Sequence, residues 1–184
     1  IMSNLKDILL KKNSCKSIWF MRQAGRYLPE FRIIRSKNPD FIKLCLNSEI
    51  SSEITLQPIT RFNLDSAIIF SDILMVPFAL GQEVKFTKHE GPQLSKFNVK
   101  NFFKNNKDKF SDKLKPIYKA IKITRKKLNK SKSLISFVGA PWTLMIYMLD
   151  LKKNKKEIRL DKFNEFKNID EIFNELIDYL CIHI

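Results

Sequence analysis

The chain has 184 residues, of which 44% are hydrophobic and 29% charged, a composition typical of a globular domain. Its three cysteines, Cys15, Cys45 and Cys181, are too few and too scattered for a disulfide framework or a CxxC zinc site. No apolar stretch reaches the ~20 residues of a membrane span, and we read no signal peptide at the start. The composition therefore predicts a cytoplasmic protein that does not enter the membrane.

The net charge of +15 is concentrated in one segment. Residues 96–132 hold thirteen lysines and Arg125 against Asp108 and Asp112, which leaves a charge of only +3 for the rest of the chain. A basic stripe is a legitimate nucleic-acid signal. This one contains mainly Lys, Asn and Ser with little Arg, which favours a solvated helix face over a nucleic-acid patch.

Short apolar runs along the chain predict the strands. Ser17–Met21, Ser66–Phe70 and Ser133–Val138 are typical of buried strands. Val84–Thr87 alternates and predicts a short exposed strand, and His89–Pro92 predicts a turn. Because these runs alternate with helical patterns, we expect βα units and a parallel sheet, hence an α/β fold.

Helical patterns fill the intervals between these runs. Ser48 is a candidate N-cap, and Pro141 suits the first position of a helix. Helices are expected over 29–46 in two pieces separated at Pro39, over 48–60, from Asp112 to Leu128, from Pro141, and over 169–180.

Arginines are concentrated directly after the first predicted strand. Arg22, Arg26, Arg32 and Arg35 lie within fourteen residues. Ligands of α/β folds meet the carboxyl ends of the strands, and the arginine fork pairs with carboxylate or phosphate through two bonds. The pattern indicates an anion-binding loop in which Gly25 would let the backbone approach a ligand. The alternative is a surface loop whose arginines pair with nearby acids.

The other two predicted strands are also followed by candidate site residues. Asp72 would accept hydrogen bonds from a ligand or cap a helix. Residues 139–141 are small and leave room beside a helix N-terminus, and Tyr147 would reach that room or pack in the core. Neither His89 nor His183 has a second ligand at metal-binding spacing, so no metal site is predicted.

Four segments together carry a family resemblance. Trp19–Arg32 is the most specific of them, and Phe70–Leu74, Glu90–Pro92 and Phe137–Leu144 follow in family order at family-like spacing. They resemble the uroporphyrinogen decarboxylase family. That resemblance implies a (β/α)8 TIM barrel that is homodimeric, cytoplasmic and free of cofactors. Family members are longer, so residues 1–184 would be the N-terminal part of one barrel domain, about the first half of the barrel.

The resemblance also implies a reaction and its residues. The family is a cofactor-independent carboxy-lyase that removes CO2 from the four acetate side chains of uroporphyrinogen III, giving coproporphyrinogen III on the route to haem and chlorophyll. Catalytic roles would fall to Asp72, which accepts hydrogen bonds from the pyrrole N–H groups, to Tyr147 near the reacting acetate, and to Arg22. The implied substrate-binding residues are Arg22, Gln23, Ala24, Arg26, Arg35, Asp72 and Tyr147.

Two other classes of protein fit parts of the sequence. A corrinoid or thiol methyltransferase of the wider superfamily would share the barrel, but it would use zinc held by His and Cys, and the arginine signature argues against it. A non-catalytic half-barrel that partners another polypeptide, or a nucleic-acid-binding module that uses the stripe at 96–132, is the remaining alternative.

Overall fold

The computed structural model describes residues 5–12, 16–87, 91–152 and 157–184. The chain divides into two compact units. The first comprises residues 1–71 and 115–137, and the second comprises 72–114 and 138–184. Over the described ranges, no helix is both long enough and apolar enough to cross a membrane.

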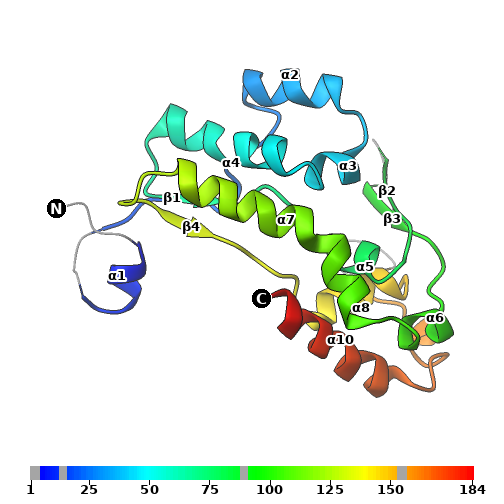
Figure 1. Ribbon diagram of the computed structural model, residues 1–184. Helices are drawn as coiled ribbons and strands as arrows, with labels where there is room; N and C mark the ends of the chain where they lie inside the picture. The colour runs from blue at the N-terminus through cyan, green and yellow to red at the C-terminus, as the bar shows by residue number, and fades with distance from the viewer. Residues whose placement is uncertain (1–4, 13–15, 88–90, 153–156) are drawn as a thin grey trace. The chain divides into compact units, whose positions relative to one another are not determined.

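The described residues form helices of varied length and short strands (Figure 1). The helices are α1 (Leu5–Leu9), α2 (Pro29–Lys37), α3 (Phe41–Cys45), α4 (Ser48–Phe62), α5 (Met75–Ala79), α6 (Val99–Phe103), α7 (Lys107–Lys127), α8 (Pro141–Met148), α9 (Leu160–Phe163) and α10 (Ile169–His183). The strands are β1 (Ser66–Ile68), β2 (Val84–Thr87), β3 (Gly91–Leu94) and β4 (Ser133–Ile135).

The first unit is built on a parallel pair of strands. β1 lies beside β4 in Figure 1, with Ser66 opposite Ser133 and Ile68 opposite Ile135. The ladder continues one step further, because Ile69 N–H donates to the Ile135 carbonyl at 3.0 Å. The parallel pairing predicted from the alternation of strands and helices is therefore confirmed, although both strands are shorter than predicted.

Two apolar clusters form the core of this unit. Leu28, Phe31, Leu44 and Ile54 make up one cluster, with Phe70 packed against it. The second cluster consists of Ile59, Leu64, Ala67 and Leu128. Residues 54 and 59 belong to α4, so this helix reaches both clusters and covers β1 with its buried face.

The prediction of a buried strand at Ser17–Met21 is wrong. This segment is irregular, and the side chains of residues 18–21 are 40–75% exposed. Ile18 makes two backbone contacts, donating to Asp65 Oδ2 at 2.7 Å and accepting from Asp65 N–H at 3.0 Å. A strand needs a continuous hydrogen-bonded neighbour, and the adjacent edge of β1 is occupied by the side chain of Gln23.

Asparagines start two of the longer helices, and the sequence prediction placed these starts differently. Asn47 caps α4, accepting a hydrogen bond from the third helical residue at 3.1 Å, whereas the Ser48 hydroxyl donates to a carbonyl of α7. α7 begins at Lys107 rather than Asp112, because Asn106 Oδ1 accepts two N–H groups of its first turn at 2.7 and 3.3 Å.

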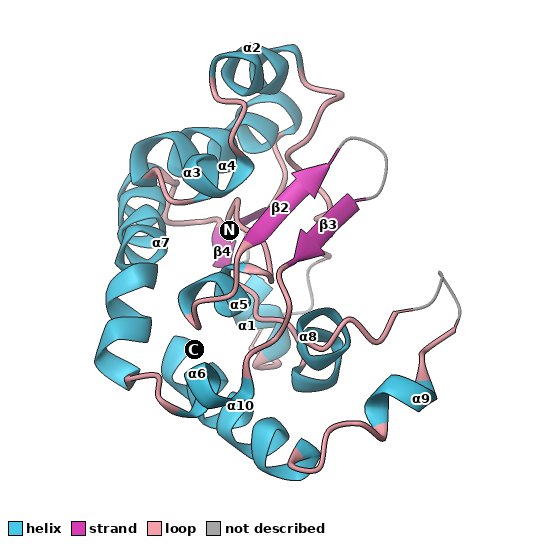
Figure 2. Ribbon diagram, turned by 90° about the vertical axis from the view of Figure 1, so that its right-hand side faces the viewer, coloured by secondary structure: helices cyan, strands magenta, loops and turns pink. Residues whose placement is uncertain are grey.

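A β-hairpin belongs to the second unit. β2 and β3 pair antiparallel, with Val84 opposite Leu94 and Thr87 opposite Gly91 (Figure 2). The strand predicted at 84–87 is confirmed. Gly91 and Pro92, expected in a turn, belong to β3, and the remainder of that predicted turn lies outside the described residues.

Aromatic packing fills the core of the second unit. The ring of Tyr179 on α10 lies 4.9 Å from that of Phe110 and 6.2 Å from that of Phe102, centroid to centroid. The amphipathic helix predicted at the end of the chain is confirmed, with Ile172 and Leu176 fully buried. α10 packs against α8, and α8 begins at a proline as predicted.

Candidate active site

The arginine-rich loop is joined to β1 by the side chain of Gln23. Its Nε2 donates to the Ser66 carbonyl at 2.7 Å, and its Oε1 accepts from Ile68 N–H at 3.2 Å. Gln23 is only 4% exposed. Both ends of the amide are therefore occupied by the strand, in a place where an unpaired polar group would be costly.

Further hydrogen bonds fold the loop onto itself. The Tyr27 hydroxyl donates to the Gln23 carbonyl, and Leu28 N–H donates to the Gly25 carbonyl at 3.0 Å. Arg32 Nη1 donates to the Arg26 carbonyl at 2.9 Å. The fully buried Leu28 side chain then joins the apolar core. The loop is consequently held by its own backbone and by the core.

The arginines of this region have different environments. Arg22 and Arg26 are exposed, and within the described ranges their guanidinium groups form no hydrogen bond or ion pair. Arg32 and Arg35 instead bind backbone carbonyls, and the Arg35 guanidinium lies 5.7 Å from the centroid of the Phe41 ring. Charge available to an anionic ligand is thus concentrated at positions 22 and 26.

Gly25 has space around it. A Cβ atom added there would meet only the Tyr27 ring, at 3.6 Å, which is an ordinary van der Waals contact. Neither its neighbours nor its backbone conformation demands glycine, so folding alone does not explain this residue.

Asp72 lies in the second unit, four residues after β1. It is half-buried, and its Oδ1 accepts from Leu74 N–H at 2.9 Å. The following helix begins at Met75 with Leu74 as its N-cap residue, so Asp72 stabilises a turn rather than capping a helix. Burial raises the pKa of the Asp72 carboxyl, and the bond from Leu74 opposes that shift.

Gly139 allows close packing between the Asp72 turn and α8, the helix that carries Tyr147. A Cβ atom at Gly139 would come within 2.9 Å of Leu144 Cδ2 and 3.1 Å of Ile73 Cβ. The absence of a side chain therefore lets the chain after β4 pack against the residue next to Asp72. Tyr147 is half-buried on α8, and Lys152 Nζ lies 5.6 Å from its ring centroid.

Two buried hydroxyl groups near the site were missed by the sequence analysis. Ser51 Oγ donates to the Phe70 carbonyl at 2.6 Å, and Thr55 Oγ1 accepts from Phe70 N–H at 2.8 Å. Thr55 also donates to the Ser51 carbonyl at 2.7 Å. These bonds fix the chain two residues before Asp72. Their sequence signal was a pair of hydroxyl residues, four apart, on the apolar face of a predicted helix.

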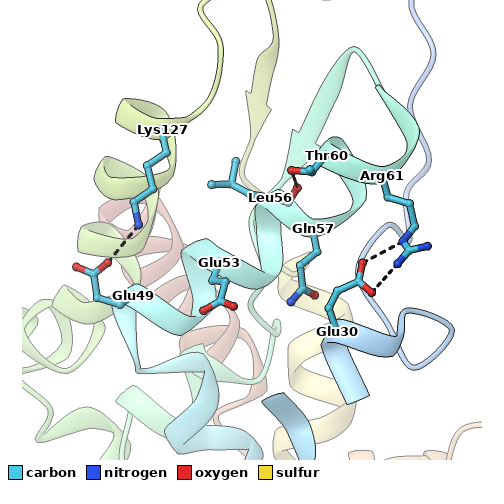
Figure 3. Close-up of a pocket in the computed structure, with 8 residues that line it drawn as sticks. All are labelled: Glu30, Glu49, Glu53, Leu56, Gln57, Thr60, Arg61 and Lys127. Carbon is cyan, nitrogen blue, oxygen red and sulfur yellow. Dashed lines mark hydrogen bonds and ion pairs between the residues drawn. The ribbon is translucent and has the colours of Figure 1, made fainter. Parts of the chain in front are cut away.

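An open groove of about 790 Å3 lies elsewhere in the first unit (Figure 3). Arg61 makes a two-bond ion pair with Glu30, at 3.0 and 2.9 Å, and Lys127 pairs with Glu49 at 3.4 Å. The groove is lined by Glu30, Glu49, Glu53, Leu56, Gln57, Thr60, Arg61 and Lys127. Both cations of the groove are neutralised by neighbouring helices, so we interpret the groove as structural.

Part of the Lys-rich segment 96–132 serves the fold. Lys113 and Lys132 donate to backbone carbonyls at 3.0 and 2.7 Å, and Lys127 pairs with Glu49.

In the described part of the chain, no three His, Cys, Asp or Glu side chains cluster as metal ligands would. The candidate site residues are the arginines of the loop in the first unit, and Asp72 and Tyr147 in the second unit.

Fold and site residues together define a class of protein. A parallel strand pair is joined through helices, an arginine loop is bound to one strand, and a half-buried carboxylate follows that strand. These are features of an α/β protein that carries a cationic loop at the edge of a strand. A family model described as Uroporphyrinogen decarboxylase (URO-D) matches residues 10–184, and the chain belongs to this family.

Curated relatives agree with the family match. The chain is 47% identical over 163 residues to a protein of Rickettsia bellii named uroporphyrinogen decarboxylase, covering 89% of this chain and 47% of that protein. It is 46% identical over 170 residues to the protein of that name from Neorickettsia sennetsu, covering 89% and 52%. The chain thus spans about half the length of the curated relatives it matches.

A solved structure supports the fold. The chain resembles a methyltransferase from Methanosarcina mazei with a TM-score of 0.59 and 13% sequence identity, covering 92% of this chain and 50% of that one. At this level of identity the likeness shows the fold alone. It agrees with the mixed α/β architecture and its parallel strands.

Proposed function

We propose that this protein acts in the decarboxylation of uroporphyrinogen III, removing CO2 from its four acetate side chains to give coproporphyrinogen III. The observation that carries the proposal is the exposed pair Arg22 and Arg26, held on a loop that is hydrogen-bonded to β1. A substrate with eight carboxylates needs fixed, permanently charged groups that bind in two-bond fashion.

Substrate binding is the role of the loop in this proposal. Arg22 and Arg26 pair with carboxylates of the macrocycle, and Arg35 contributes from α2. The backbone at Ala24 lies against the substrate, beside Gln23. Burying several carboxylates against preoriented guanidinium groups fixes the macrocycle in one orientation, which lowers the entropic cost of the reaction.

Asp72 stabilises the reacting pyrrole. Its carboxylate accepts hydrogen bonds from the pyrrole N–H groups, and such donors reduce the cost of the half-buried charge, the same cost that raises the pKa of Asp72. Protonation makes the pyrrole ring a cationic, iminium-like acceptor. As the bond to CO2 breaks, its electron pair flows into that ring and neutralises the cation. The exocyclic carbon then takes a proton and becomes the methyl group, and the ring releases the proton that it had gained, so one proton is consumed for each CO2 released. A fixed carboxylate stabilises the cation.

Two further residues act at the acetate. The Tyr147 hydroxyl bonds near the reacting group, and Arg22 orients the acetate or shuttles a proton to it. In the same proposal, residues 1–184 form the N-terminal part of a single (β/α)8 barrel domain of a homodimeric, cytoplasmic enzyme. The parallel β1–β4 pair and the likeness to the methyltransferase support a barrel of this kind.

The experiment is an assay of the native gene product, with its intact mass measured on the same sample. Formation of coproporphyrinogen from uroporphyrinogen is expected, and a native product without turnover would overturn the proposal. Asp72→Ala should abolish turnover in a folded protein. Arg26→Lys should reduce turnover more than Lys119→Ala, an exposed-site control, because a point charge cannot replace the fork. Equal effects would contradict the role of the fork.

A further inference from the structure

On the edge of β1 that faces away from β4, the backbone N–H and C=O groups form hydrogen bonds with side chains rather than with a neighbouring strand. Along a strand, successive residues present their N–H and C=O groups to opposite edges. Beyond the end of β1, Ile69 N–H still bonds to β4, so the backbone polar groups of Ser66 and Ile68 in the strand, and of Phe70 after it, face the other side. That second edge is where the side chains of the arginine loop and α4 bind.

Gln23 reproduces the bonds of a residue in a parallel strand. Such a residue donates to one carbonyl and accepts from the N–H two residues further along. The amide of Gln23 does this with Ser66 O and Ile68 N–H, at 2.7 and 3.2 Å. Its orientation is fixed chemically, because a flipped amide would set its oxygen against the Ser66 carbonyl and its nitrogen against the Ile68 N–H.

The same residue is an anchor of the arginine loop. Its carbonyl accepts the Tyr27 hydroxyl, Arg22 directly precedes it, and Arg26 follows three residues later. Both ends of its amide are bonded to β1, and at 4% exposure the side chain offers almost no surface to a ligand. Its influence on a ligand must pass through the backbone that carries the two arginines.

We propose that Gln23 is a positioning residue, whose side chain acts as a substitute strand residue and holds Arg22 and Arg26 at the edge of β1. The proposal rests on the proposed function only for the identity of the ligand. The bond to the strand is a property of the fold, and it can be tested without a ligand.

Hydrogen exchange tests the bond in the unmodified protein. The Gln23 carboxamide protons and the Ile68 amide proton should exchange at least tenfold more slowly than those of an unstructured peptide. Gln23→Met keeps the length of the side chain and removes both bonds, so exchange at Ile68 should rise. Gln57→Met, a half-buried glutamine on α4 outside the loop, is the matched control and should leave exchange at Ile68 unchanged. Fast exchange in the unmodified protein, or no rise in Gln23→Met, overturns the proposal.

Ligand selectivity tests the positioning role. The probes are uroporphyrin, with eight carboxylates, and coproporphyrin, with four, both measured by fluorescence titration. Gln23→Met should weaken uroporphyrin binding by about tenfold or more, since small misplacements of binding groups are costly, and the ratio of the two dissociation constants should approach one. Partial unfolding would lower the binding fraction for both ligands and leave that ratio unchanged, which would contradict positioning. If the unmodified protein binds neither porphyrin while Ile68 is protected, the proposed function fails and the bond to the strand stands.

Discussion

Replacing Thr55 by valine should loosen the chain that leads into the candidate site. Thr55 is 1% exposed, and its hydroxyl accepts from Phe70 N–H at 2.8 Å while donating to the Ser51 carbonyl at 2.7 Å. Valine has nearly the same shape but cannot accept that hydrogen bond. The substitution therefore leaves a backbone N–H unsatisfied two residues before Asp72.

The size of the effect follows from that unsatisfied group. Leaving a buried donor unpaired costs about 1–3 kcal/mol. With a denaturant slope of about 2 kcal/mol/M, a loss of about 2 kcal/mol lowers the urea midpoint by roughly 1 M. Urea unfolding followed by circular dichroism measures this shift, and hydrogen exchange at Phe70 should rise in the same variant.

Ser52→Ala is a matched control on the same helix. Ser52 is fully buried, and its hydroxyl finds no hydrogen-bond partner among the described residues. Removing an unpaired polar atom and gaining alanine should change the free energy of unfolding by about 0 to +1 kcal/mol, in the stabilising direction. Equal urea midpoints for Thr55→Val and Ser52→Ala would refute the reasoning that the Phe70 bond matters.

Three further substitutions test the second unit and the loop. Asp72→Asn keeps the bond from Leu74 but removes the half-buried charge. Because the folded pKa of Asp72 is raised, the unmodified protein loses stability as pH rises from below the unfolded pKa through the folded one. The variant's advantage in unfolding free energy should therefore grow over that pH range, and a constant difference would contradict it. Gly139→Ala should cost about 1–3 kcal/mol by overpacking against Leu144. Gly25→Ala should leave thermal stability unchanged and weaken porphyrin binding, because the added methyl group would hinder approach of the ligand to the backbone. Equal melting temperatures for the two glycine variants would refute the packing argument.

The parallel strands could be predicted from the sequence because their apolar runs are short and bounded by polar residues. Ser66 and Ser133 begin both the predicted and the observed strands. The run at 17–21 has the same apolar pattern, yet it does not form a strand. A pattern of side chains predicts burial, but it carries no information on whether a backbone neighbour is present at the strand edge.

The sequence predicted those features of the candidate site that follow from residue type. It could not predict the features that depend on which groups each side chain contacts in the folded chain. The density of four arginines predicted an anion-binding loop, and in the structure Arg22 and Arg26 are exposed, as that prediction requires. Arg32 and Arg35 belong to the same predicted cluster, but their guanidinium groups bind backbone carbonyls. Spacing alone cannot distinguish a side chain that faces a ligand from one that bonds to the backbone.

The side chains on the edge of β1 also bear on synthesis of the chain. Gln23, Ser51 and Thr55 all precede β1, so they are available as soon as the strand leaves the ribosome. The opposite edge must wait for β4, which begins at Ser133. An exposed strand edge invites pairing with other chains. During elongation, one of the two edges of β1 can therefore be closed before its true strand partner has been made.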